Sequence, residues 1–490
     1  MAGTDSRVHD ELSPPLHVVM FPWLAFGHIV PFLELAQQLA SRGHFVTFVS
    51  APRNLARLRP VLPELKPRIR LLPLPLPPVD GLPDGAESTA DVPPEKVELL
   101  KVAFDGLAAP FAAFLDDACA GGGGEGHGRK PDWIILDFAQ HWLPAIADKH
   151  KLPCAVFLIF PASAVAFVGS KELNDAHPRS SAADFTVPPP WIPSPSCIAF
   201  RGHEAEWFAR AWQPNASGVS DMTRVLETMQ LCPLLICRCS HEVDGPLCPL
   251  LGHLHRKPVL PSGHLAPYHA ARAAATASGA DDDKETAGLM RWLDAQPARS
   301  VLYVAFGSEA PLAPEHVTAL ALGLELAGVR FLWALREMSG GLLPDGFEGR
   351  TRATGRGMVR VGWVPQVRVL GHEAVGGFFT HAGMSSLVES FLFGHPIVML
   401  PLFADQGLTA RLMAERQVGV EVPWRVGGGA AFAAEDVAAA VRRVMLVEEG
   451  EEGEVFRRNA GELKEVLWDT ARQERYIDDL VEQLLHRRTV

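Results

Sequence analysis

The segment from residue 363 to 406 constrains the fold more than any other part of this sequence. It alternates short apolar runs with turns of small and polar residues, so that residues 376–380 are predicted as a buried strand, 386–393 as a helix and 396–400 as the next strand. A strand, a turn, a helix and a further strand in this order are typical of a parallel sheet. We therefore predict an α/β fold.

The turn inside this segment, His381-Ala382-Gly383-Met384-Ser385-Ser386, is its chemically most informative part. Open α/β sheets bind ligands at the carboxyl ends of their strands. A helix that begins just after His381 would present free backbone N–H groups and the positive end of its dipole there. Ser385 and Ser386 add hydroxyl donors. The turn is predicted to bind an anion such as phosphate.

Length and composition favour a large globular protein. The 490 residues exceed what one core normally holds, so two or three domains are expected. A net charge of −12 offers no basic surface for nucleic acid or an acidic membrane. No apolar run reaches the roughly 18 residues of a membrane helix. Because residues 1–13 are polar and lack a secretory leader, we expect a cytoplasmic protein.

Metal binding is not favoured by the sequence. Cys232, Cys237 and Cys239 lie close together among seven cysteines, but no second ligand pair has zinc spacing, so we interpret them as buried small side chains. The acidic run at 281–283 lies in a stretch rich in Ala, Gly, Ser and Asp, without a strand to fix it, and is interpreted as solvated. We predict no metal site.

The first half of the chain begins as a βαβ unit. Residues 16–21 and 45–49 are predicted strands, and 31–40 a helix with Pro31 at its start, which leaves His28 in the intervening loop. A histidine there is compatible with a structural role or with proton transfer.

Asp137 ends a further predicted strand, residues 133–136, in the same half of the chain. Its carboxylate could orient the imidazole of His28, or it could cap a helix over residues 139–149. The two roles do not exclude each other.

The second half repeats the same alternation of strands and helices. A strand over 301–306, the turn Gly307-Ser308 and a helix over 314–327 precede strands at 331–335 and 358–361. Residues 435–446 and 460–485 have helical periodicity.

The 363–406 segment resembles the signature box of plant family 1 UDP-sugar-dependent glycosyltransferases. Its length of 44 residues is that of the family's box. The family's conserved positions occur at the same spacing: W-x-P-Q, L-x-H, G-x-F-x-T-H, G-x-x-S, E, G-x-P and D-Q. Gly27-His28-Ile29-Val30-Pro31 resembles the family's G-H-x-x-P segment. The resemblance covers nearly the whole chain.

It implies the GT-B architecture: two Rossmann-like domains with parallel sheets facing a central cleft. The implied divisions are an acceptor-binding domain (1–260), a linker (261–288), a UDP-sugar-binding domain (289–465) and a C-terminal helix that returns to the first domain (466–490).

The resemblance also implies roles for residues. His28 is expected to be the catalytic base and Asp137 its partner, with the UDP-sugar as co-substrate and no metal. Trp363 would stack on uracil, Glu389 would bind the ribose, and Asp405 with Gln406 would bind the sugar. The complete set of implied donor-binding residues is Ser308, Trp363, Val364, Gln366, His381, Gly383, Met384, Ser385, Ser386, Glu389, Asp405 and Gln406.

One departure concerns the turn, because most family members read H-C-G-W-N-S where this chain has Met384 and Ser385. The change bears on the identity of the donor sugar more than on the class of reaction. The segments GLPDGAEST, RWLDAQPARSVLYVAFGSEAPL and GLELAGVRFLWALR resemble the subgroup that glycosylates existing glycosides, such as the steviol and flavonoid glycoside branching enzymes. We therefore expect an inverting, monomeric enzyme that transfers glucose from UDP-glucose to a sugar hydroxyl of a small terpenoid or flavonoid glycoside.

Three alternatives remain open. The acceptor could be an aglycone, or the donor UDP-rhamnose or UDP-xylose. The altered turn also admits a UDP-sugar-binding protein without catalysis, although such a protein would not need His28 and Asp137. A nicotinamide dehydrogenase is disfavoured, because no G-x-G-x-x-G follows the first strand.

Overall fold

The computed structural model describes residues 14–120, 127–276, 283–307, 312–336, 342–425, 431–446 and 452–488. The chain forms two compact units: Met1–Phe157 with Leu231–Leu235 and Arg475–Val490, and Leu158–Gln230 with Ile236–Glu474. The predicted domain boundaries follow the sheets rather than these units, and they stay a prediction.

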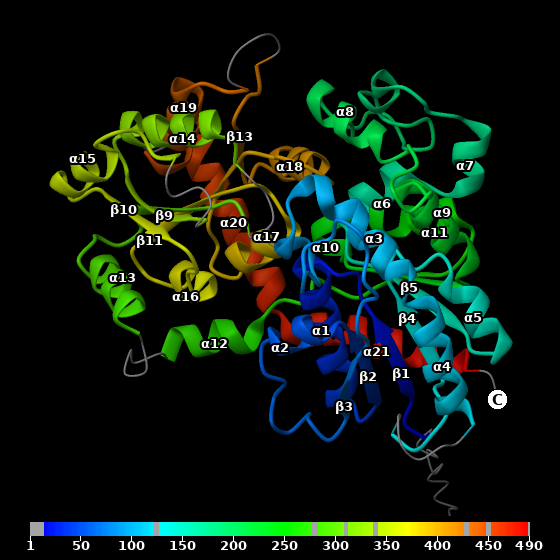
Figure 1. The fold of residues 1–490 in the computed structure, drawn as a ribbon. Coiled ribbons are helices and arrows are strands. Elements are labelled where there is room, and N and C mark those ends of the chain that lie inside the picture. Colours follow the sequence, from blue (N-terminus) through cyan, green and yellow to red (C-terminus); the bar gives the residue numbers. More distant parts are fainter. Residues whose placement is uncertain are drawn as a thin grey trace, which may run out of the picture. The chain divides into compact units, whose positions relative to one another are not determined.

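The first half of the chain forms a seven-stranded sheet in the order β3-β2-β1-β4-β5-β6-β7 (Figure 1). Its strands are β1 (His17–Phe21), β2 (Phe45–Ser50), β3 (Ile69–Pro73), β4 (Trp133–Leu136), β5 (Cys154–Leu158), β6 (Leu234–Cys237) and β7 (Val259–Pro261). The pairs from β3 to β5 are parallel. The strands predicted in this half are confirmed to within two residues, and their side chains are almost all buried because helices cover the sheet.

Helices and turns fill the rest of this half. The α-helices are α1 (Phe26–Ser41), α2 (Pro52–Ala56), α3 (Val97–Asp105), α4 (Ala108–Cys119), α5 (Leu143–Lys149), α6 (Ala162–Val168), α7 (Lys171–Ala176), α8 (Gly202–Arg210), α9 (Asp221–Leu231), α10 (His241–Asp244) and α11 (Leu247–His255). Short 3-10 helices cover Thr89–Asp91, Pro94–Lys96 and Ala182–Phe185.

Helix α1 differs from the prediction at its start. It begins at Phe26, five residues before Pro31, which lies inside the helix. A proline in a helix removes one hydrogen bond, but the side chains of Ile29 and Phe32 are fully buried on either side of it, and this burial holds the extra turn in place. His28 therefore lies in the first turn of a helix rather than in a loop.

The second half forms a six-stranded sheet in the order β10-β9-β8-β11-β12-β13, in which every neighbouring pair is parallel. Its strands are β8 (Val301–Ala305), β9 (Arg330–Leu335), β10 (Gly357–Val361), β11 (Val375–Thr380), β12 (Ile397–Met399) and β13 (Gly419–Glu421). Two parallel sheets confirm the predicted α/β class.

The helices of this half are α12 (Tyr268–Thr276), α13 (Lys284–Asp294), α14 (Pro314–Ala327), α15 (Phe347–Ala353), α16 (Gln366–Leu370), α17 (Met384–Phe391), α18 (Gln406–Glu415), α19 (Ala434–Met445), α20 (Glu452–Trp468) and α21 (Thr470–His486). Helices α14 and α19 lie side by side (Figure 1). They approach so closely that a Cβ on Gly323 would stand 2.5 Å from the Cβ of Val437.

The C-terminal part of the chain and the predicted linker both contain helices. The segment 460–485, for which the periodicity predicted helical structure, belongs to two helices, α20 and α21, separated at Asp469, whose carboxylate accepts a hydrogen bond from the backbone N–H of Arg472. The predicted linker at 261–288 contains α12 and the start of α13. Asp283 caps α13 by accepting from two backbone N–H groups, while residues 281 and 282 lie outside the described part.

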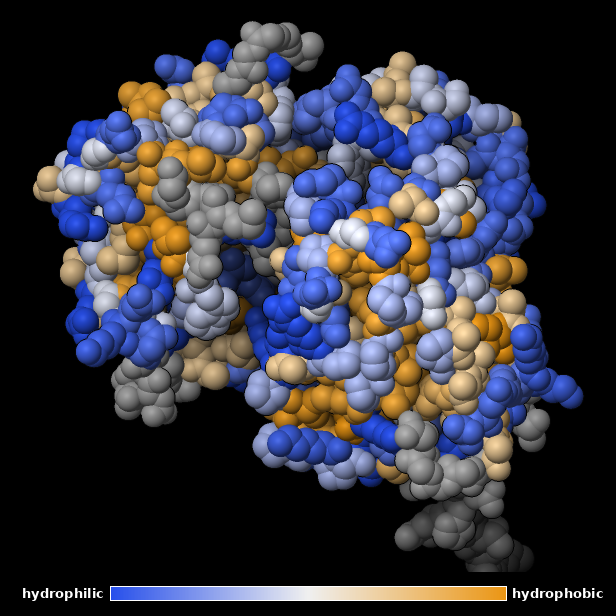
Figure 2. Space-filling model, viewed as in Figure 1, coloured by the Kyte–Doolittle hydropathy of each residue, from blue (hydrophilic) through white to orange (hydrophobic). Residues whose placement is uncertain are grey.

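The surface mixes hydrophilic and hydrophobic residues on the face drawn in Figure 2, with hydrophilic residues predominating. Among the described residues, no helix combines the length and the apolar character that are needed to cross a membrane.

The buried His395, just before β12, makes stability depend on pH. Its Nε2 lies 2.6 Å from the carbonyl oxygen of Leu370, and burial lowers the pKa of its imidazole to about 4. An unfolded histidine titrates near 6.5, so the unfolded chain binds more protons between about pH 6.5 and 4. The contribution of His395 is therefore complete above pH 6.5 and decreases as the pH falls towards 4.

We predict that His395→Gln reduces the loss of unfolding free energy between pH 6.5 and 4. That loss amounts to at most about 3 kcal/mol for one such histidine. The measurement is the difference between thermal unfolding midpoints at pH 7.5 and pH 4.5. The exposed His269, changed to Gln, serves as the control and should leave that difference as in the wild type. An unchanged difference in His395→Gln would contradict the prediction.

Candidate functional site

The first cluster of predicted residues forms where β1 and β4 end. Phe21 of β1 pairs with Leu136 of β4, so the segments that follow both strands emerge at the same edge of the sheet. There the Nδ1 of His28 lies 2.7 Å from the Oδ2 of Asp137, and the carboxylate side chain is 1% exposed. The sequence placed these two residues in one half of the chain, and the structure brings them into contact.

Asp137 is held by backbone donors. Its Oδ2 accepts from the N–H of Trp23 at 2.9 Å and its Oδ1 from the N–H of Phe138 at 2.7 Å. The side chain of Gln140 braces the same turn, because its oxygen accepts from the N–H of Asp137 and its nitrogen donates to the carbonyl of Phe21. Donors of this kind stabilise a carboxylate charge and fix its position.

This arrangement determines what His28 can do. Since Nδ1 points at a carboxylate, the neutral imidazole carries its proton there and Nε2 is the basic nitrogen. The alternative interpretation of Asp137 as the cap of the following helix is wrong, because α5 begins at Leu143 and its N-cap is Trp142. The geometry is that of an oriented general base.

The second cluster lies at the edge where β8 and β11 end. These strands are neighbours, and Ala305 pairs with Thr380. The imidazole of His381 fits between two glycines: a Cβ on Gly307 would stand 2.9 Å from the ring, and a Cβ on Gly383 would stand 2.5 Å from its Nε2. Ser308, which was predicted beside them, lies outside the described residues.

His381 is neutral in this environment. Burial lowers the pKa of its imidazole to about 4, and its Nδ1 lies 3.3 Å from the hydroxyl oxygen of Thr380. A neutral imidazole can donate one hydrogen bond and accept another.

The backbone between β11 and α17 is strained. Ala382 has φ +65°, in the left-handed region, which costs an alanine about 1 kcal/mol. This turn lets α17 begin at Met384, two residues earlier than predicted, so Ser385 and Ser386 belong to its first turn. The N-cap residue Gly383 supplies no side-chain hydrogen bond to the helix. The first N–H groups of α17 are therefore available for an anion.

A polar network continues along α17. The Nε2 of Gln366 donates to Glu389 at 2.8 Å and lies 3.4 Å from the Oγ of Ser386. The hydroxyl of Tyr303, on β8, donates to the Oε1 of Gln366 at 3.4 Å, and burial raises the pKa of that phenol, which keeps it protonated. Tyr303 has the pattern of a core residue within its strand, so no sequence signal distinguishes it as part of the site.

The remaining predicted donor residues occupy two loops. Trp363, after β10, is 75% exposed, whereas its neighbour Val364 is buried. Asp405 and Gln406 stand at the start of α18, and the Oε1 of Gln406 accepts from the N–H groups of Leu402 and Phe403. That oxygen stabilises the loop, so only the amide nitrogen of Gln406 and the carboxylate of Asp405 suit ligand hydroxyls.

The cysteines are the remaining candidate metal ligands that the sequence raised. All seven are thiols outside disulfide bonds, and Cys232, Cys237 and Cys239 are buried as predicted. Within the described ranges, no group of three His, Cys, Asp or Glu side chains is arranged to hold a metal ion.

Comparison with known proteins identifies relatives of the whole chain. The profile of the family "UDP-glucoronosyl and UDP-glucosyl transferase" matches residues 268–470. UDP-glycosyltransferase 91D1 of Stevia rebaudiana is 40% identical over 99% of this chain and 95% of its own length. Anthocyanidin-3-O-glucoside rhamnosyltransferase of Petunia hybrida is 33% identical over 96% of this chain and 97% of its own.

A solved structure of similar fold is Medicago truncatula UGT71G1 complexed with UDP-glucose. It has a TM-score of 0.73 and 21% identity, and covers 97% of this chain and 99% of its own. The shared fold is the predicted GT-B class.

The close fit of His381 predicts the effect of an added methyl group. In Gly383→Ala the new Cβ would displace the imidazole. We expect UDP, the nucleotide in the description of the matching family, to bind about tenfold more weakly to this variant. The measurement is calorimetric titration with UDP.

Gly461→Ala is the matched control. It lies within α20, and a Cβ there would meet nothing within 4 Å. It should bind UDP like the wild type and be slightly more stable, because alanine favours helices. Equal UDP affinity in both variants would show that the packing around His381 does not shape the site.

Proposed function

This chain belongs to the UDP-glucoronosyl and UDP-glucosyl transferase family and is a UDP-glycosyltransferase; from that premise we propose that it transfers glucose from UDP-glucose to a sugar hydroxyl of a small terpenoid or flavonoid glycoside, with inversion. The observation that carries the proposal is the His28–Asp137 pair at 2.7 Å, an oriented base in the first unit of the chain.

The proposed reaction is one displacement. The acceptor oxygen forms a bond to the anomeric carbon while the bond from that carbon to the UDP oxygen breaks. The Nε2 of His28 takes the acceptor proton, and Asp137 stabilises the imidazolium that results. A single displacement inverts the configuration, so an α-linked donor gives a β-linked product.

The donor would be bound by the second cluster. Trp363 stacks on uracil, as its large exposed face allows, and Glu389 accepts hydrogen bonds from the ribose hydroxyls beside Gln366. The N–H groups of α17, with His381, Ser385 and Ser386, bind the diphosphate and stabilise its charge as UDP leaves, which requires no metal. Asp405 and Gln406 bind the sugar.

A glycoside acceptor is supported by the Petunia relative, whose name states a glucoside as its substrate. That name also states a rhamnosyl transfer, which favours UDP-rhamnose as the second candidate donor for this chain. The test is a product assay by mass spectrometry with UDP-glucose, UDP-rhamnose and UDP-xylose against paired aglycones and monoglycosides. A hexose gained only on monoglycosides supports the proposal, a deoxyhexose supports the second candidate, and the absence of any product contradicts both.

Removal of the base should abolish transfer but not donor binding. We predict that His28→Ala and Asp137→Asn lower kcat by about 100- to 10,000-fold, the usual contribution of a general base, with unchanged affinity for UDP.

The control pair is His150–Asp116 in the same unit, whose Nε2 and Oδ1 atoms lie 3.2 Å apart. His150→Ala should keep full activity. If His28→Ala transfers sugar at the wild-type rate, His28 is not the base.

Loss of the exposed indole should weaken nucleotide binding. Because stacking contributes about 1–3 kcal/mol per base, Trp363→Ala is expected to raise the Kd for UDP by about 5- to 100-fold. Trp207→Ala removes another partly exposed indole of the same unit and should leave that Kd unchanged. Identical affinities in both variants would place uracil elsewhere.

A further inference from the structure

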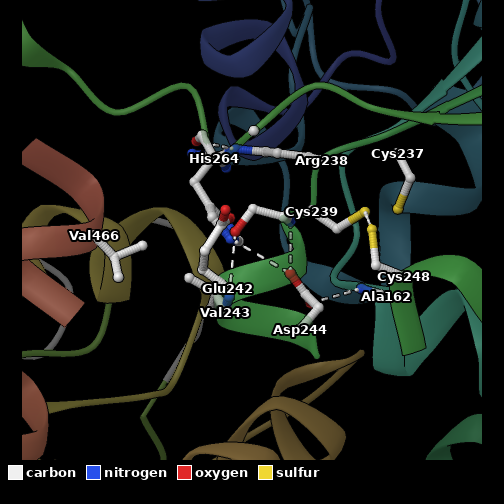
Figure 3. Close-up of polar contacts among 12 residues, drawn as sticks. Ala162, Cys237, Arg238, Cys239, Glu242, Val243, Asp244, Cys248, His264 and Val466 are labelled. Atoms are coloured by element: carbon white, nitrogen blue, oxygen red, sulfur yellow. Dashed lines mark hydrogen bonds and ion pairs between the residues drawn. The ribbon is translucent and has the colours of Figure 1, made fainter. Parts of the chain in front are cut away.

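Arg238, directly after β6, is a buried cation beside the predicted diphosphate site. It is 3% exposed, and arginine is seldom buried without strong hydrogen bonds. Its Nε donates to the carbonyl oxygen of His264 at 2.8 Å (Figure 3), and its Nη1 donates to the Oγ of Ser385 at 2.8 Å. Arg238 and Ser385 belong to the same compact unit.

The carbonyl that orients Arg238 belongs to a histidine whose side chain lies beside a buried carboxylate. The Nε2 of His264 lies 3.4 Å from the Oδ2 of Asp244, and both side chains are almost completely buried (Figure 3). Asp244 is fixed in turn, because it accepts from the N–H of Ser240 at 3.0 Å and from the N–H of Ala162 at 3.3 Å. The guanidinium is therefore oriented by a backbone carbonyl of a buried residue.

The contact determines the orientation of the Ser385 hydroxyl. Its oxygen accepts a charge-assisted hydrogen bond from Arg238, so its own proton can be donated to a further acceptor. Ser385 is the second residue of α17, where the helix dipole also favours an anion. The short serine side chain thus receives a hydrogen bond from a positively charged group.

We propose that Arg238 is a positioning residue for the donor diphosphate: it orients the Ser385 hydroxyl towards a phosphate oxygen and brings a fixed positive charge to the group that leaves. The proposal rests on the proposed function, since it assumes that a nucleoside diphosphate occupies the start of α17.

The test is a double-mutant cycle with Arg238→Gln, Ser385→Ala and the combined variant. Calorimetric titrations with UDP and with uridine separate the diphosphate from the rest of the nucleotide. Each single change should weaken UDP binding by about 10- to 100-fold, the usual effect of losing a charged hydrogen bond, and leave uridine binding unchanged. The combined variant should lose no more UDP affinity than the single variant that binds UDP more weakly, because the two residues act as one.

Two further variants separate positioning from simple destabilisation. Arg238→Lys keeps the charge and should restore part of the UDP affinity. Arg179→Gln removes another buried arginine of the same unit, one that bonds Val168 and Asn174, and should lower the unfolding midpoint without changing the ratio of UDP to uridine affinity.

The outcomes that overturn the proposal are distinct from a failure of the proposed function. The proposal is contradicted if Arg238→Gln lowers the affinities for UDP and for uridine equally. It is also contradicted if the fold-losses of UDP affinity in Arg238→Gln and Ser385→Ala multiply in the combined variant. If Arg238→Gln does not fold, Arg238→Lys and Ser385→Ala test the proposal, since both must weaken the binding of UDP more than the binding of uridine. A wild-type chain that binds UDP but glycosylates no acceptor refutes the proposed function alone, because every arm here measures binding.

Discussion

The parallel pairing of β8 with β11 is the constraint on which the second cluster depends. It brings two turns to one edge, and the imidazole of His381 fills the space between Gly307 and Gly383. Because neither glycine tolerates a side chain there, the turn that leads into α17 has little freedom. The left-handed backbone at Ala382 is the energetic cost of this geometry, and such strain is typical of functional sites.

The first cluster follows the same logic with different chemistry. The pairing of β1 with β4 brings the start of α1 next to Asp137, whose carboxylate is surrounded by backbone donors. One sheet edge thus holds an imidazole oriented by a carboxylate, and the other presents helix N–H groups and hydroxyls. The proposed reaction needs these two kinds of group, one to remove a proton and one to stabilise a departing anion.

Local periodicity predicted much of the fold. The strand Trp133–Leu136 and the helix Pro314–Ala327 have the bounds that the apolar pattern indicated, because burial on a sheet imposes that pattern directly. The start of α1 was missed because a proline normally marks the first turn, and here tertiary burial outweighs that preference. The break at Asp469 was missed because the helical period continues across it.

The sequence offered candidate residues for the site and one of the contacts between them, that of His28 with Asp137. Motifs spaced along the sequence identified His28, Asp137 and His381. The hydrogen bond from Arg238 to Ser385 joins residues 147 positions apart, and no local sequence pattern predicts it. Such a contact depends on how elements pack, which periodicity does not determine.

The most direct test of the account is titration of the wild-type chain with UDP and with uridine in a buffer that contains a metal chelator. If the start of α17 binds the diphosphate through N–H groups and hydroxyls, UDP should bind at least about tenfold more tightly than uridine with the chelator present. Equal affinities, or UDP binding that is lost on chelation, would contradict the central claim.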